Sequence, residues 1–184
     1  MFHFLRRRAT PAEELLTAVA AAAAAFPAMA AGVDALPTDN GTVAAQMAND
    51  NASGSQLPVL DLAAHRGKVI YVDFWASWCG PCRKSFPWMQ AMQRELGGRG
   101  LVVLTVNVDA ERADAERFLA EYGGTLPVVF DTKGQLAELY KLQAMPSSFL
   151  IDRQGKIRYR HRGFREADPA NYAAEIHQLL DEKT

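Results

Sequence analysis

An apolar run from Val69 to Trp75 restricts the fold of this chain more than any other feature. The run, VIYVDFW, is short, nearly continuous and rich in β-branched and aromatic residues, which is typical of a strand buried on both faces. After a tight turn comes Cys79-Gly80-Pro81-Cys82. From Cys82 to Leu96 the pattern predicts a helix that Gly97-Gly98 would end. A central strand that leads directly into a helix is therefore expected, with the cysteines at the junction.

The rest of the chain continues this alternation. The hydrophobic pattern predicts strands over residues 101–108, 128–130, 148–152 and 156–161, and helices over residues 113–122, 136–140 and 171–180. The last two strands flank a turn at Arg153-Gln154-Gly155. Strand–helix alternation followed by a hairpin and a closing helix predicts an α/β sandwich with a mixed sheet.

The first 56 residues differ in composition from the remainder. Arg6-Arg7-Arg8, an alanine-rich apolar run and the small-residue site Ala28-Met29-Ala30 follow the order of a secretory signal. Residues 1–30 are predicted to be a signal peptide or an N-terminal anchor, with an amphipathic or disordered arm as the alternative. Residues 31–56 are predicted to be a flexible linker, and residues 57–184 the compact domain. The expected location is the periplasm, where the chain would be free or tethered to the inner membrane.

Charge and cysteine content exclude several classes of protein. The net charge is −1 and no Lys/Arg run resembles a nucleic-acid footprint, so no nucleic-acid partner is expected. The two cysteines lie in one CxxC, which leaves none for a disulfide framework or a four-cysteine zinc site. A bond between them closes so short a loop that its role should be chemical rather than structural. Half of a zinc site and an inert buried pair are the alternatives.

The CxxC motif suits thiol–disulfide exchange. The thiolate is the nucleophile, and a free cysteine with a pKa of about 8.5 is mostly protonated at neutral pH. Placing Cys79 at the start of a helix favours its anion. Pro81 is tolerated there because its missing N–H would be unpaired in a first helical turn. We expect Cys79 to attack a target disulfide and Cys82 to resolve the mixed disulfide.

Two separate segments resemble known redox proteins. Residues 75–83, WASWCGPCR, resemble the active-site signature of the thioredoxin superfamily, and the longer stretch from Gly67 to Pro87 resembles its TlpA/ResA-like disulfide reductases. Residues 145–157, MPSSFLIDRQGKI, are similar to the cis-proline strand and turn of the same family. The resemblance covers residues 57–180. It implies a thioredoxin-like three-layer sandwich around a central mixed sheet, with an inserted helix–strand unit within residues 110–143.

The resemblance also implies residue roles. Pro146 would be the cis-proline that faces the CxxC and lets the preceding backbone pair with substrate, with an ordinary trans proline as the alternative. Met145 would lie beside the Cys79 sulfur, and Gly163 would let a substrate backbone come close. Trp78 would shield the site and contact partners. The implied substrate-binding set is Trp78, Gly80, Pro81, Met145, Pro146 and Gly163, with Trp75 and Pro87 in structural roles nearby.

Asp73 is the third expected catalytic residue, with Cys79 and Cys82. It lies six residues before Cys79 and matches the buried acid of thioredoxin. Burial raises the pKa of a carboxyl group, so Asp73 would accept the Cys82 proton; an acid on an exposed strand face is the alternative. Thr105 stands where thioredoxin has the lysine that pairs with this acid, so Asp73 is expected to titrate differently here. TlpA-like proteins often lack an aspartate at this position.

The CGPC sequence resembles that of reducing thioredoxins, which predicts a reductase of disulfides in partner proteins. The resemblance implies a monomer with no cofactor beyond the Cys79–Cys82 disulfide, and with a membrane electron donor that re-reduces it. A thiol oxidase or isomerase is one alternative. A copper-site assembly module is another, although residues 141–144 lack the histidine that such relatives carry. A peroxidase would need a different cysteine setting.

Overall fold

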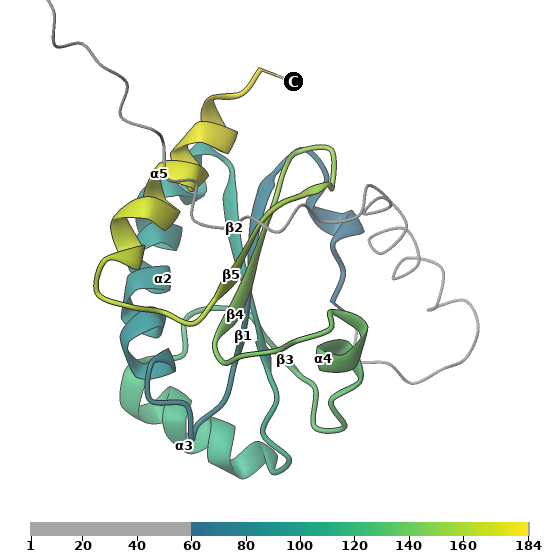
Figure 1. The fold of residues 1–184 in the computed structure, drawn as a ribbon, viewed down its shortest axis with the longest axis vertical. Coiled ribbons are helices and arrows are strands. Elements are labelled where there is room, and N and C mark those ends of the chain that lie inside the picture. The colour runs from purple at the N-terminus through teal and green to yellow at the C-terminus, as the bar shows by residue number, and fades with distance from the viewer. Residues whose placement is uncertain (1–59, 184) are drawn as a thin grey trace, which may run out of the picture. The chain divides into compact units, whose positions relative to one another are not determined.

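The computed structural model describes residues 60–183; the predictions for residues 1–56 fall outside this range. None of the helices in the described part is long and apolar enough to cross a membrane. Figure 1 shows the arrangement of the elements. In chain order they are η2 (Ala63–His65), β1 (Val69–Trp75), α2 (Cys82–Leu96), η3 (Gly97–Arg99), β2 (Leu101–Asn107), α3 (Arg112–Tyr122), β3 (Val128–Phe130), α4 (Gln135–Leu139), β4 (Ser147–Ile151), β5 (Ile157–Arg162) and α5 (Asp168–Asp181).

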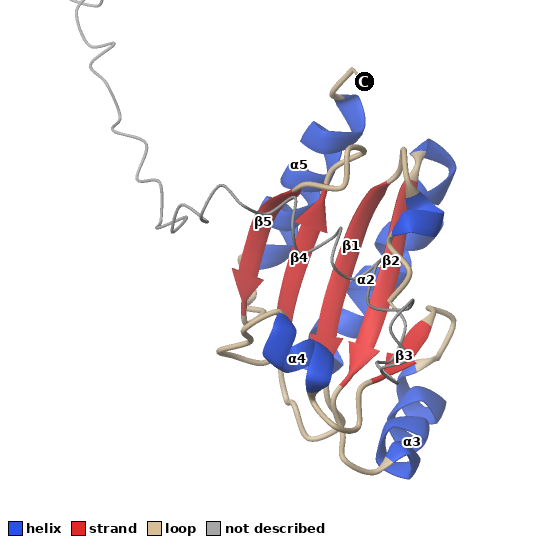
Figure 2. Ribbon diagram, turned by 90° about the vertical axis from the view of Figure 1, so that its right-hand side faces the viewer, coloured by secondary structure: helices blue, strands red, loops and turns tan. Residues whose placement is uncertain are grey.

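The described strands form one mixed sheet in the order β3-β2-β1-β4-β5 (Figure 2). β1 runs parallel to β2 and antiparallel to β4, and β4 and β5 form the antiparallel hairpin. All seven residues of β1 are buried, which explains why its sequence is apolar on both faces. The predicted mixed sheet is confirmed.

Helices cover both faces of this sheet. α2, α3 and α5 lie on one side and α4 on the other (Figures 1 and 2). Alternate residues of β1 enter the two cores: Val69, Tyr71 and Trp75 pack with α2, whereas Ile70, Val72 and Phe74 pack with α4. The three-layer, thioredoxin-like α/β sandwich is therefore confirmed, and Asp73 belongs to the face under α2.

The predicted element boundaries agree with the structure to within three residues, and the end of α2 shows one difference. Gly97 keeps a helical backbone (φ −57°, ψ −41°), and a short 3-10 turn continues to Arg99. The turn ends at Gly100, whose φ of 105° is a left-handed conformation that suits glycine. The α-helix ends at Leu96 as predicted, and the short 3-10 turn that follows it was not predicted.

The predicted helix–strand unit corresponds to α3 and β3, which lie between β2 and α4. β3 extends the sheet beside β2 in a parallel register. α3 packs onto the α2 side through Ala115 and Phe118. This unit brings a second helix close to the segment that carries the cysteines.

Candidate active site

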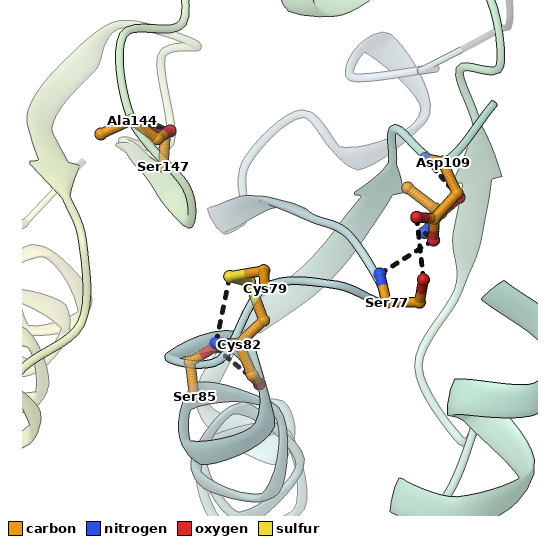
Figure 3. The surroundings of a disulfide bond; sticks show 8 residues. Ser77, Cys79, Cys82, Ser85, Asp109, Ala144 and Ser147 are labelled. Atoms are coloured by element: carbon orange, nitrogen blue, oxygen red, sulfur yellow. Dashed lines mark hydrogen bonds between the residues drawn. A yellow bond between two sulfur atoms is a disulfide. The ribbon is translucent and has the colours of Figure 1, made fainter. Parts of the chain in front are cut away.

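Cys79 and Cys82 are joined by a disulfide of 2.01 Å at the N-terminus of α2 (Figure 3). Both are buried, at 3% and 0% exposure. The helix itself begins at Cys82, and Cys79 lies in the preceding turn. The backbone N–H of Cys82 donates to Cys79 Sγ at 3.2 Å, so the Cys79 sulfur sits where the helix offers an N–H group to an anion.

The charges around this turn favour a thiolate at Cys79 in the reduced protein. The first turn of α2 contains no acidic residue. Arg83 and Lys84 follow Cys82 directly and are exposed. A helix N-terminus and neighbouring cations both lower the pKa of a cysteine thiol. This arrangement agrees with the expected role of Cys79 as the attacking sulfur.

The chain before β4 forms the opposite wall of the site (Figure 3). The Met145–Pro146 peptide bond is cis. Met145 packs against the core cluster that contains both cysteines. Ser147 Oγ donates to the Ala144 carbonyl at 2.7 Å, which holds this turn together. Gly163 has a φ of 85°, and its N–H donates to the Pro146 carbonyl at 2.7 Å, so β5 supports the turn from behind.

Asp73 is 1% exposed, so it is buried rather than on an exposed strand face. Burial raises its pKa well above the usual value of an aspartate. Its Oδ2 has no hydrogen-bond partner among residues 60–183. Thr105 lies directly opposite on β2, but its hydroxyl donates to the Pro127 carbonyl at 2.9 Å. Because position 105 is a threonine and not a lysine, this strand brings no positive charge to the Asp73 carboxyl.

The two tryptophans before Cys79 have different environments. Trp75 is fully buried, and its ring lies 5.1 Å from that of Phe86 and 4.7 Å from that of Phe118. Trp78 is 66% exposed beside the disulfide. Gly80 and Pro81 are also exposed, so the turn presents an open surface next to Cys79. Pro87 lies inside α2.

A polar hollow of about 450 Å³ adjoins this surface. Ser77 and Arg83 line one side of it, and α3 lines the other. The α3 residues are Asp114, Arg117, Phe118, Glu121 and Tyr122. The helix–strand unit thus supplies one wall of a recess that carries charges of both signs.

Asp109 is a site residue that the sequence did not single out. Its two carboxylate oxygens accept the backbone N–H and the hydroxyl of Ser77, both at 2.9 Å (Figure 3). Asn107 Nδ2 donates to the same carboxylate at 2.8 Å. Ser77 lies two residues before Cys79, so this clamp holds the turn. The available signal was Asp109's place just after β2, where the carboxyl ends of two parallel strands meet.

The sequence pattern of the Redoxin family matches residues 25–176. The chain belongs to the Redoxin family. It is similar to the thiol-disulfide oxidoreductase ResA of Bacillus subtilis, with 32% identity over 108 residues, 59% of each protein. The ResA of Geobacillus thermodenitrificans is 34% identical over 97 residues, which are 53% of this chain and 56% of that protein. The chain thus matches less than two thirds of the length of either relative.

Solved structures of similar proteins share the fold. A putative thiol:disulfide interchange protein DsbE from Chlorobium tepidum is 50% identical, with a TM-score of 0.63 over 65% of this chain and 84% of that one. A putative protein disulfide isomerase from Bacteroides thetaiotaomicron is 27% identical, with a TM-score of 0.60 over 66% and 79%. The resemblance to ResA-like members of the thioredoxin superfamily is therefore confirmed. Within the described part of the chain, no three His, Cys, Asp or Glu side chains gather as a metal site would require.

Proposed function

We propose that this Redoxin-family chain is a periplasmic thiol–disulfide oxidoreductase that reduces disulfides in partner proteins through Cys79 and Cys82. The observation that carries the proposal is the Cys79–Cys82 disulfide, whose outer sulfur accepts an N–H from the start of α2. A cysteine pair in which one sulfur accepts a helix N–H can cycle between disulfide and dithiol. The printed names of the ResA and DsbE relatives support the same chemistry.

The reaction starts from the dithiol. The Cys79 thiolate attacks one sulfur of the target disulfide, and the other target sulfur leaves as a thiolate that takes a proton from water. Cys82 then gives its proton to Asp73 and attacks the Cys79 sulfur. The Cys79–Cys82 disulfide forms and the second target thiolate leaves. Two electrons have moved to the target, and a membrane electron donor returns two electrons to the oxidised protein.

The surface around Cys79 suits a protein substrate. Trp78, Gly80 and Pro81 are exposed beside the disulfide, and the chain between Ala144 and Ser147 lies across from it (Figure 3). Aromatic side chains that stand exposed are common anchors in protein interfaces. The hollow between Arg83 and α3 adds charged groups for polar contacts. We assign target recognition to these elements, with Gly163 behind the turn.

Trapping tests this function directly. Cys82→Ser cannot resolve the mixed disulfide, so partner proteins should remain bonded to Cys79. Cys79→Ser is the matched control because it keeps one cysteine at the site but lacks the attacking sulfur. Recovery of partners with Cys82→Ser and none with Cys79→Ser is the expected result. Equal recovery from both variants, or none from either, contradicts the proposal.

Redox equilibrium with glutathione distinguishes a reductase from an oxidase. A reductase should have a potential near that of thioredoxin, about −270 mV, whereas the oxidant DsbA lies at about −120 mV. A value close to that of DsbA contradicts the reductase assignment and favours the oxidase. The periplasmic location rests on the pattern of residues 1–30, and a fusion of residues 1–56 to a reporter that is active only after export tests it.

A further inference from the structure

A chain of hydrogen bonds runs through the core on the α2 side of the sheet, beyond the residues of the proposed mechanism. The Tyr71 hydroxyl donates to Ser148 Oγ at 2.7 Å. Ser148 Oγ lies 3.0 Å from His161 Nδ1, and His161 Nε2 lies 2.6 Å from Glu175 Oε2. The four residues come from β1, β4, β5 and α5. The chain therefore crosses the domain from the central strand to an outer helix.

The direction of each hydrogen bond follows from the chemistry of the groups. Burial raises the pKa of Tyr71 well above its usual value, so Tyr71 keeps its proton and donates it to Ser148. The Ser148 hydrogen is then directed to His161 Nδ1, because a hydroxyl has one donor. A carboxylate accepts, so His161 carries its proton on Nε2, toward Glu175. The Ser148–His161 and His161–Glu175 hydrogen bonds thus both donate in the direction of Glu175.

The inner end of this chain lies beside Asp73. Ser148 is directly opposite Asp73 in the β1–β4 register, and side chains of such a pair share a face with Cβ atoms about 4.5–5.5 Å apart. Asp73 Oδ2 has no partner among the described residues. Ser148 Oγ retains a second lone pair, so it can accept from a protonated Asp73 directly or through one water.

The outer end reaches solvent. The His161 and Glu175 side chains are 8% and 27% exposed. Exposure thus rises along the chain, from 1% at Asp73 and 3% at Ser148. Asp73 is only 1% exposed, so a proton on its carboxyl has little direct access to bulk water.

We propose that Ser148, His161 and Glu175 form the proton exit by which Asp73 discharges the proton taken from Cys82. This inference rests on the proposed function, in which Asp73 accepts that proton. The transfer balances: Asp73 gives its proton to Ser148 Oγ, Ser148 gives its own to His161 Nδ1, and His161 gives its Nε2 proton to Glu175. Glu175 releases it to water, and rotation of the Ser148 hydroxyl with a half-turn flip of the His161 ring restores the starting arrangement.

The groups that face His161 favour this role. Tyr71 from β1, Ser148 from β4, and Tyr172 and Glu175 from α5 contact the ring. The Tyr172 ring stacks on the imidazole at 3.7 Å and fixes its plane. Burial raises the pKa of Tyr172 as well as that of Tyr71, so both phenols stay neutral. Among the described residues, Glu175 is the only carboxylate that forms a hydrogen bond with the His161 ring.

The test follows the two steps of a single turnover with 5,5′-dithiobis(2-nitrobenzoate), whose two halves absorb light when released. The first release reports attack by Cys79 and the second reports attack by Cys82. His161→Gln should leave the first phase unchanged and slow the second about tenfold, less than the roughly 10²-fold or more that a general base contributes. D₂O should also slow the second release more in His161→Gln than in the wild type.

A double-mutant cycle separates proton transfer from a structural effect. In the Asp73→Asn background, His161→Gln should cause no further slowing, because there is no proton to export. Equal slowing with and without Asp73, or an unchanged D₂O effect, overturns the proton exit. Ser148→Ala is a second variant that interrupts the chain with little change in volume and should give the same pattern.

His177→Gln is the matched control. His177 lies on α5 like Glu175, but its Nδ1 bonds to Arg99, so it should change neither phase. If Asp73→Asn slows the second phase and His161→Gln does not, the proton exit is overturned and the proposed function stands. If neither release depends on Cys79, the proposed function fails first.

Discussion

Asp109 holds Ser77 with both oxygens of its carboxylate: Oδ2 accepts the backbone N–H and Oδ1 accepts the hydroxyl, each at 2.9 Å. The two residues come from different strand ends and are 32 positions apart. Asp109 is only 2% exposed, so water cannot replace these bonds easily. The turn that carries Cys79 is thereby attached to the end of β2.

Asp109→Ala should therefore loosen the active-site turn. It leaves the N–H of Ser77 and the amide of Asn107 without their acceptor, and an unsatisfied buried group costs about 1–3 kcal/mol. Ser77→Ala removes only the hydroxyl bond and should cost about 1 kcal/mol. Urea unfolding of the oxidised proteins measures both. A larger loss for Ser77→Ala than for Asp109→Ala contradicts the clamp.

Asp73 makes stability depend on pH in an unusual direction. Its pKa is higher in the folded than in the unfolded protein because it is buried. The folded state therefore holds the proton more tightly, so this contribution is complete below the unfolded pKa of about 3.9 and is lost as the pH rises through the folded pKa. Most carboxylates in salt bridges have a lowered pKa, so they stabilise the folded protein at high pH and not at low pH.

The variant Asp73→Asn, which does not titrate, isolates this contribution. Relative to the wild type, its free energy of unfolding should be greater near pH 8 than near pH 4, because only the wild type loses the Asp73 contribution as the pH rises. Denaturant midpoints of both proteins, measured from pH 4 to pH 8 with the disulfide intact, test this prediction. A stability difference that grows toward acid pH contradicts it.

The sequence predicted those features that depend on neighbouring residues. The bounds of β1 and α2 follow from one apolar run and one CxxC motif, and both agree with the structure. The Asp109–Ser77 clamp and the Tyr71–Ser148 bond join residues 32 and 77 positions apart, and they depend on strand register. The order β3-β2-β1-β4-β5 is a property of the whole fold, so no local pattern could place these partners.

Trp78 provides a test of target recognition that does not disturb the fold. Its side chain is 66% exposed, so Trp78→Ala should change the free energy of unfolding by no more than about 0.5 kcal/mol. If Trp78 contacts protein targets, the variant should have a raised KM for a protein disulfide and an unchanged rate with a small aromatic disulfide. A proportional loss with both substrates would instead assign Trp78 to the chemistry at Cys79.

Phe118 tests whether α3 is part of the structure that supports the active site. Its ring lies 4.7 Å from that of Trp75, 5.4 Å from that of Phe86 and 4.6 Å from that of Tyr122, and only 4% of the residue is exposed. Phe118→Ala should therefore destabilise the protein by about 3–5 kcal/mol. Glu116→Ala, on the exposed side of the same helix, is the matched control and should stay within about 0.5 kcal/mol of the wild type.

Because Phe118 also lines the hollow beside Ser77, its loss should slow the attack by Cys79 on protein targets more than Glu116→Ala does. Small and equal effects of the two substitutions on stability would mean that α3 is attached to the sheet without supporting it.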